Sequence, residues 1–149
     1  MIKLIIVDDH RHVREAWSWV LSQVSRINIV AQCANGQEAI EAAKSFQPDV
    51  MLMDIHMEPV NGIEATRRIK QFAPAIKIIA VSIQADPSYV NEMLRSGADG
   101  YVTKNSNGNE MIRAIDSVLS GKTYLCREIA HFGSGDNNSY DDPGTTDII

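Results

Sequence analysis

The chain has 149 residues, a formal net charge of −5 and 44% apolar residues. This size and composition favour one globular domain, and the acidic balance argues against a nucleic-acid-binding surface on the chain itself. No apolar run reaches the length of a membrane span, no signal peptide opens the sequence, and the two cysteines have no metal-type spacing. We therefore expect a cytoplasmic protein that makes no membrane contact.

In the first half of the sequence, apolar runs of strand length alternate with apolar stripes at helical spacing. The run KLIIV predicts a buried strand over 3–7, and Val13, Trp17 and Leu21 mark the helix after it. INIVAQC predicts a second strand over 27–33 that ends at the turn Asn35-Gly36. The next helical stripe stops at Pro48.

The second half continues the alternation. VMLMD, IKIIAVS and GYVTK predict three further strands over 50–54, 76–82 and 100–104, each followed by a helical stripe. Five strand–helix repeats predict an α/β fold with a parallel sheet covered by helices on both faces. Periodicity does not give the strand order. We expect a flavodoxin-like doubly wound sheet of five strands in the order 2-1-3-4-5, with five helices.

Polar residues stand where four of these strands end. Asp8 and Asp9 follow the first strand, Asp54 ends the third, Ser82 ends the fourth and Lys104 follows the fifth. Because the carboxyl ends of parallel strands share one edge of the sheet, these side chains should meet in one shallow pocket.

Three carboxylates in one pocket repel one another, so either some are protonated or a cation joins them. Oxygen ligands without Cys or a His cluster suit Mg²⁺, which in turn favours a phosphoryl ligand. Lys104 adds a positive charge and Ser82 a hydroxyl donor. This set of groups predicts transfer of a phosphoryl group to an aspartate, and the central Asp54 is the candidate nucleophile.

The segments VDDH, VMLMDIHM, IIAVS, GADGYVTK and GKTYLCREIA, in this order, resemble the receiver domain of two-component response regulators. The likeness is greatest to the subfamily with a LuxR/NarL-type helix-turn-helix output. It implies a receiver domain over 1–130. The polar composition of 131–149 is typical of a flexible tail or linker toward an output domain that this chain lacks.

The resemblance implies a role for each polar residue at the pocket. Asp54 would be the phosphoacceptor, Asp9 would bind Mg²⁺ directly, Asp8 would bind it mostly through water, and the backbone carbonyl of His56 would be a further ligand. Ser82 would hydrogen-bond the phosphoryl group and Lys104 would pair with it. Tyr101 would be the aromatic switch residue that responds to Ser82.

The same resemblance implies how the domain works with other proteins. The phosphodonor would be a sensor histidine kinase, activation would favour a homodimer, and DNA would be bound only through the missing domain. The chain would not be an enzyme beyond self-catalysed phosphotransfer and autodephosphorylation.

Two positions depart from the family pattern. Glu58 stands between Met57 and Pro59, where the family usually has Met-Pro, and could add a fourth acid near the metal. Ile83 is bulky where a small residue often follows the switch hydroxyl. We hypothesise that it crowds the phosphoryl group and slows its hydrolysis.

Other interpretations stay open at this point. The fold also suits an aspartyl-nucleophile phosphatase, although His56 stands where such enzymes need a second aspartate, or a flavin-binding protein, although no glycine-rich loop follows the first strand. Taken alone, Asp8 and Asp9 are typical of a helix cap, and Tyr101 of a core aromatic. His10, His12 and His56 are typical of surface or helix-start histidines.

Overall fold

The computed structural model describes residues 1–83, 86–127 and 129 of the chain. The strands are β1 (Ile2–Val7), β2 (Ile27–Cys33), β3 (Val50–Asp54), β4 (Lys77–Ser82), β5 (Gly100–Thr103) and β6 (Tyr124–Leu125). The helices are α1 (Arg11–Ser22), α2 (Gly36–Phe46), α3 (Gly62–Phe72), α4 (Pro87–Arg95) and α5 (Gly108–Leu119). No helix in this described part is both long enough and apolar enough to cross a membrane.

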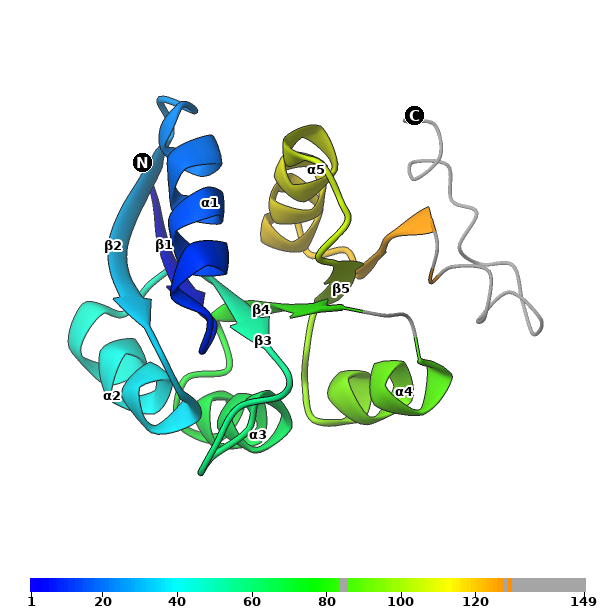
Figure 1. Cartoon of the computed structure of the whole chain (residues 1–149). Helices are drawn as coiled ribbons and strands as arrows, with labels where there is room; N and C mark the ends of the chain where they lie inside the picture. Colours follow the sequence, from blue (N-terminus) through cyan, green and yellow to red (C-terminus); the bar gives the residue numbers. More distant parts are fainter. Residues whose placement is uncertain (84–85, 128, 130–149) are drawn as a thin grey trace.

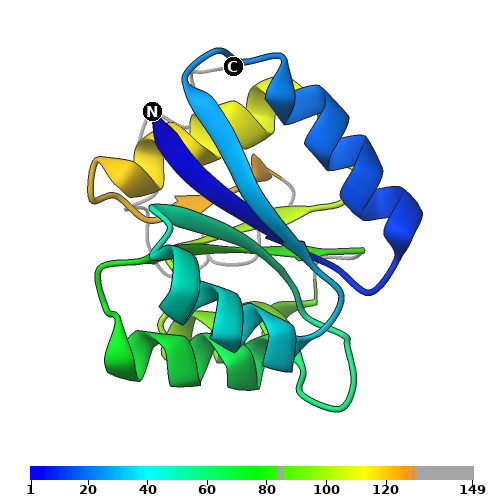
Figure 2. The ribbon, with the colours of Figure 1, turned by 90° about the vertical axis from the view of Figure 1, so that its left-hand side faces the viewer.

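All six strands are parallel and form one sheet in the order β2-β1-β3-β4-β5-β6. The predicted fold class and the order 2-1-3-4-5 are confirmed, and the expectation of five strands is corrected by the short sixth strand at the edge of β5. Figure 1 shows α1 and α5 on one face of the sheet, and α2, α3 and α4 on the other. Figure 2 shows the same three layers from the side. The predicted tail over 131–149 lies outside the described residues.

Three helices begin with the same local sequence, Asn-Gly-x-Glu. In each, the Asn side chain accepts a hydrogen bond from the backbone N–H of the Glu three residues later: Asn35 with Glu38, Asn61 with Glu64, and Asn107 with Glu110. An N-cap of this kind satisfies a backbone donor that the first turn of a helix leaves free. These caps fix where α2, α3 and α5 begin, directly after the loops that border the predicted pocket.

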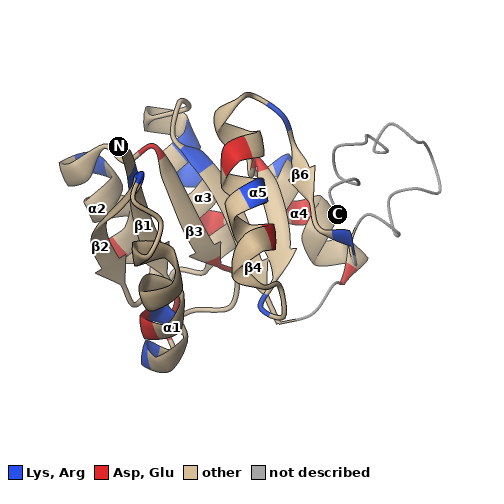
Figure 3. Ribbon diagram, turned by 90° about the horizontal axis from the view of Figure 1, so that it is seen from above, with Lys and Arg blue, Asp and Glu red and all other residues tan. Residues whose placement is uncertain are grey.

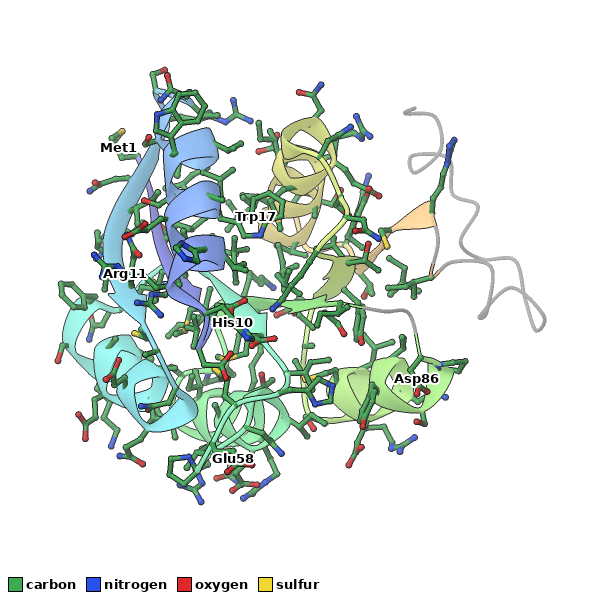
Figure 4. The ribbon with its side chains drawn as sticks, viewed as in Figure 1. Met1, His10, Arg11, Trp17, Glu58 and Asp86 are labelled. Carbon is green, nitrogen blue, oxygen red and sulfur yellow. The ribbon has the colours of Figure 1, made fainter. Side chains whose placement is uncertain are left out.

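The two tryptophans of α1 have different surroundings. Trp17 is buried and points toward α5 (Figure 4). Trp19 is 68% exposed, as its position outside the apolar stripe predicts. Figure 3 shows acidic and basic residues mixed along the elements that are seen from above, and the chain as a whole carries a net charge of −5.

Candidate functional site

The predicted acidic residues meet at the carboxyl edge of the sheet. β1 and β3 are neighbours with Val7 opposite Met53, so Asp8 and Asp54 leave the two strands side by side. Both carboxylates are buried, with 3% of each residue exposed, whereas Asp9 is exposed. The neighbouring positions of β1 and β3 therefore bring together two carboxylates that lie 46 residues apart in the sequence.

Lys104 lies between these two buried acids. Its Nζ is 2.8 Å from Asp8 Oδ2 and 3.3 Å from Asp54 Oδ1. Burial and, after it, the charge of Asp8 raise the pKa of Asp54 to about 6, although Lys104 acts in the opposite direction. Burial lowers the pKa of Lys104, but its contacts with Asp8 and Asp54 outweigh burial and raise this pKa overall. The ammonium group of Lys104 therefore serves as a counter-ion for both carboxylates.

His10 is an exposed residue at the start of α1, as expected, and its ring also borders the acidic pocket. Its Nδ1 lies 2.9 Å from Asp9 Oδ1 and 3.3 Å from Asp8 Oδ1, and its backbone N–H donates to Asp8 Oδ1 at 2.8 Å. His10 is the N-cap residue of α1 and makes no side-chain cap hydrogen bond. Asp8 thus binds the N–H of the residue before α1, which differs from the ordinary helix cap that an Asp pair suggests.

The pocket fits a divalent cation by its donors and its charge. One ligand atom each from Asp8, Asp9, His10 and Asp54 lie within 4.8 Å of one another. Carboxylate oxygens are the ligands that Mg²⁺ prefers, and a cation would relieve the repulsion that raises the pKa of Asp54. The expected fourth acid, Glu58, is not a member of this group, and Figure 4 shows it well apart from His10. The side chain of His56 is exposed and packs edge-on against Tyr89, with 4.8 Å between ring centroids.

Ser82 and Tyr101 lie beside the acidic pocket on β4 and β5. Asp54 pairs with Val81, so Ser82 is one residue beyond the acid on the next strand, and the backbone N–H of Lys104 donates to the Ser82 carbonyl at 2.6 Å. Tyr101 is fully buried. Burial raises the pKa of the Tyr101 phenol, and the nearby Ser82 hydroxyl acts in the opposite direction. The Tyr101 hydroxyl makes no hydrogen bond to a described residue. Ser82 is therefore placed between the acids and the predicted switch residue.

Gly62 is needed for the loop between β3 and α3 to close on the pocket. Its N–H donates to the Ile55 carbonyl at 2.8 Å, and a Cβ at this position would lie 1.9 Å from the Asp54 carbonyl oxygen. No side chain fits at that distance. The Gly in the Asn-Gly pair that begins α3 thus allows the helix to start directly against the strand end that carries Asp54. Ile83, the residue after Ser82, is 65% exposed, and its expected effect on phosphoryl hydrolysis stays a prediction.

Comparison with known proteins identifies the family. Residues 4–116 match the response regulator receiver domain family. The chain is 38% identical over 130 residues to the transcriptional regulatory protein DegU of Brevibacillus brevis, which covers 87% of this chain and 55% of DegU. It is 35% identical over 152 residues to the oxygen regulatory protein NreC of Staphylococcus aureus strain JH9, which covers 98% of this chain and 69% of NreC.

A solved structure shows the same fold. The crystal structure of a two-component response regulator of the LuxR family from Aurantimonas sp. SI85-9A1 superposes with a TM-score of 0.87 at 30% identity, covering 91% of this chain and 97% of that one. The chain spans a little over half the length of DegU. The match over residues 4–116 places this chain in the response regulator receiver domain family.

Proposed function

We propose that the chain is a phosphorylation-dependent signalling switch in which Asp54 accepts a phosphoryl group from a sensor histidine kinase. The observation that carries this proposal is the burial of Asp54 between Asp8 and Lys104 at the carboxyl edge of the sheet. In the reaction, an Asp54 carboxylate oxygen forms a bond to phosphorus as the bond from phosphorus to the donor breaks. Lys104 neutralises charge on the phosphoryl oxygens, and the Ser82 hydroxyl donates a hydrogen bond to one of them.

The proposed Mg²⁺ ligands are the carboxylates of Asp8, Asp9 and Asp54 and the backbone carbonyl of His56. Receiver domains bind Mg²⁺ at an acidic pocket, and the grouping of Asp8, Asp9 and Asp54 supports the same site here. A bound Mg²⁺ would neutralise the charge that an incoming phosphoryl group meets. The other groups proposed for transfer belong to the chain and the donor, and water later hydrolyses the Asp54 phosphate to release inorganic phosphate. We therefore propose that both steps are self-catalysed and that the chain is not an enzyme with its own turnover substrate.

The proposed output is control of a DNA-binding domain that follows the receiver domain in the whole protein. The names of DegU and of the LuxR-family structure support this role, as does the greater length of DegU. Phosphorylation adds about −1.5 to −2 charges, and Ser82 with Tyr101 would convert this charge into a shift of β4 and β5 that favours a homodimer. We divide the chain into a receiver domain over 1–130 and a linker over 131–149.

Intact mass tests the phosphoacceptor. After incubation with Mg²⁺ and a small phosphodonor such as phosphoramidate, we expect wild type to gain the mass of one phosphoryl group, and Asp54→Ala to gain none. The matched control is Asp116→Ala, which removes an exposed carboxylate paired with Arg26 far from the pocket and should be modified like wild type. A modified Asp54→Ala protein would refute the assignment. Steady release of phosphate from a generic ester would instead support the phosphatase alternative.

Mg²⁺ affinity tests the membership of the metal site. Asp9→Asn removes a charged ligand and should weaken Mg²⁺ binding at least about tenfold, which corresponds to about 1.4 kcal/mol. Glu58→Gln removes a charge from an exposed loop residue outside the grouped ligand atoms and should change the affinity less than about twofold at physiological ionic strength. Titration of both variants by calorimetry measures the two effects. Equal losses in the two variants would show that Glu58 belongs to the site after all.

A further inference from the structure

The chain itself occupies the outer edge of β5. The segment that follows α5 returns as β6 and pairs in parallel with β5, with Tyr101 opposite Leu125. The N–H of Tyr124 donates to the Asp99 carbonyl at 3.1 Å, and the N–H of Cys126 donates to the Tyr101 carbonyl at 3.0 Å. The edge of β5 beside the predicted switch residue is therefore a docking surface whose occupant is a segment of the same chain.

The docked segment is packed into the core. Tyr124, Leu125, Cys126 and Ile129 are all buried, and the last two are only 1% exposed. The Tyr124 hydroxyl donates to Glu110 Oε2 on α5 at 3.1 Å. Apolar burial and main-chain hydrogen bonds are what hold added strands on sheet edges. The segment is thus held both by β5 and by α5.

A continuous set of backbone pairings joins the acidic pocket to β6. Asp54 on β3 pairs with Val81 on β4, and the N–H of Lys104 donates to the Ser82 carbonyl. Tyr101 then pairs with Ala80 on its inner side and accepts from Cys126 on its outer side. A movement of β5 at the pocket must therefore change the geometry of its bonds to β6, unless β6 moves with it.

The strand order sets the direction of the effect. β4 and β5 lie between β3, which carries Asp54, and β6. If Ser82 and Lys104 close on a phosphoryl group at Asp54, the ends of β4 and β5 shift toward β3. That shift is directed away from β6, so the bonds at Tyr124 and Cys126 would lengthen unless β6 follows β5.

We propose that β6 is an intramolecular strand whose docking on β5 opposes the phosphorylated arrangement, and that phosphorylation loosens it. The inference rests on the proposed function, because it takes Asp54 as the phosphoacceptor. Loosening of β6 would pass the signal directly to the chain that continues beyond residue 129. While it is docked, β6 also keeps the β5 edge from pairing with a second copy of the domain.

Hydrogen exchange of the full chain tests the loosening. With Mg²⁺, addition of beryllofluoride, a phosphoryl mimic, should speed exchange of the Tyr124 and Cys126 amides at least threefold, since exchange reports local opening. The same addition should leave Asp54→Ala unchanged. Unchanged or slower exchange at these amides, with altered exchange in β4 and β5, would overturn the inference while the proposed function stands. If beryllofluoride alters no amide and phosphoramidate adds no mass, the proposed function fails as well.

Linkage gives an independent test, because a contact that phosphorylation loosens must also oppose binding of the mimic. Cys126→Pro removes the N–H that donates to the Tyr101 carbonyl. It should lower about fivefold the beryllofluoride concentration at half-saturation (the midpoint), measured by ¹⁹F NMR. Two variants serve as controls. Cys126→Ala keeps the backbone N–H, and Arg127→Pro introduces a proline ring one residue later, at an exposed residue. Arg127→Pro should bind like wild type, and Cys126→Ala, which removes only a buried thiol, should lower the midpoint far less than Cys126→Pro.

A second variant keeps the test valid if Cys126→Pro does not fold. Tyr124→Phe removes only the hydroxyl that donates to Glu110, so it weakens β6 without altering the backbone. Its midpoint should also fall, by a smaller factor of at least about 1.5, and Glu110→Gln should lower it in the same direction. Midpoints equal to or above that of wild type in the folded variants would overturn the inference.

Discussion

Lys104→Met should lower the free energy of unfolding by about 3 kcal/mol at pH 7.5 in the absence of divalent cations. The substitution keeps most of the aliphatic volume but leaves the buried carboxylates of Asp8 and Asp54 without the ammonium group that contacts both. Removing one partner of a buried ion pair commonly costs about 3–5 kcal/mol, because an uncompensated charge stays buried. The exposed Asp9 beside the pair gives water some access, which places the expected loss at the lower end.

Urea unfolding measures this loss of stability, and two further variants of the chain test its cause. Lys122→Met removes an exposed lysine and should stay within about 0.5 kcal/mol of wild type. Lys104→Met combined with Asp54→Asn should recover most of the stability, because one of the two stranded charges is gone. If Lys104→Met is as stable as Lys122→Met, the lysine is not the counter-ion of the pocket.

Asp54→Asn should make the metal-free protein more stable than wild type by about 3 kcal/mol at pH 7.5. Burial and the charge of Asp8 raise the pKa of Asp54 from 3.8 to about 6 in the folded protein. A raised pKa means that the folded state binds the proton more tightly than the unfolded chain. The contribution to stability is therefore fully present below pH 3.8 and is lost as the pH rises through about 6. That difference in pKa corresponds to about 3 kcal/mol of folding stability, which wild type loses when Asp54 ionises. The amide of Asn cannot ionise, so the variant keeps this stability.

Thermal unfolding at several pH values measures the difference between the two proteins. The stabilities of wild type and Asp54→Asn should converge near pH 4 and separate as the pH rises to 7.5. Saturating Mg²⁺ should then raise the stability of wild type more than that of the variant, because the variant lacks one charged ligand. A gap between the proteins that is independent of pH would show that Asp54 is not destabilised by ionisation.

The strand-end residues of the site could be predicted from the sequence for a simple physical reason. Buried parallel strands are short apolar runs whose ends are easy to locate, and the sheet brings their carboxyl ends to one edge. This logic placed Asp8, Asp54 and Lys104 together, and the distances from Lys104 Nζ to both carboxylates agree with it. The Asn35-Gly36 pair marked the end of the second strand, and the structure shows that the Asn35 side chain also caps the first turn of α2.

Features that depend on irregular backbone or on distant pairing could not be predicted. β6 has two residues, too few to show a period of two, and its partner carbonyls on Asp99 and Tyr101 lie some 25 residues earlier. His10 reaches the acids because it is the extended N-cap residue of α1, with φ −100° and ψ 113°, and no side-chain pattern encodes that geometry. Glu58 lies in a loop whose path is set by contacts such as that of Gly62 with Ile55, so its distance from the pocket was not readable either.

The counter-ion arrangement around Lys104 has a consequence for the order in which the pocket is loaded. When Asp8, Asp9 and Asp54 are ionised, three negative charges face one ammonium group, which leaves a local charge of −2. An anionic phosphodonor that arrives first meets repulsion, whereas a divalent cation that arrives first brings the pocket to electroneutrality. The cation should therefore precede the donor, and the availability of the free cation becomes a threshold below which the domain does not respond to its donor.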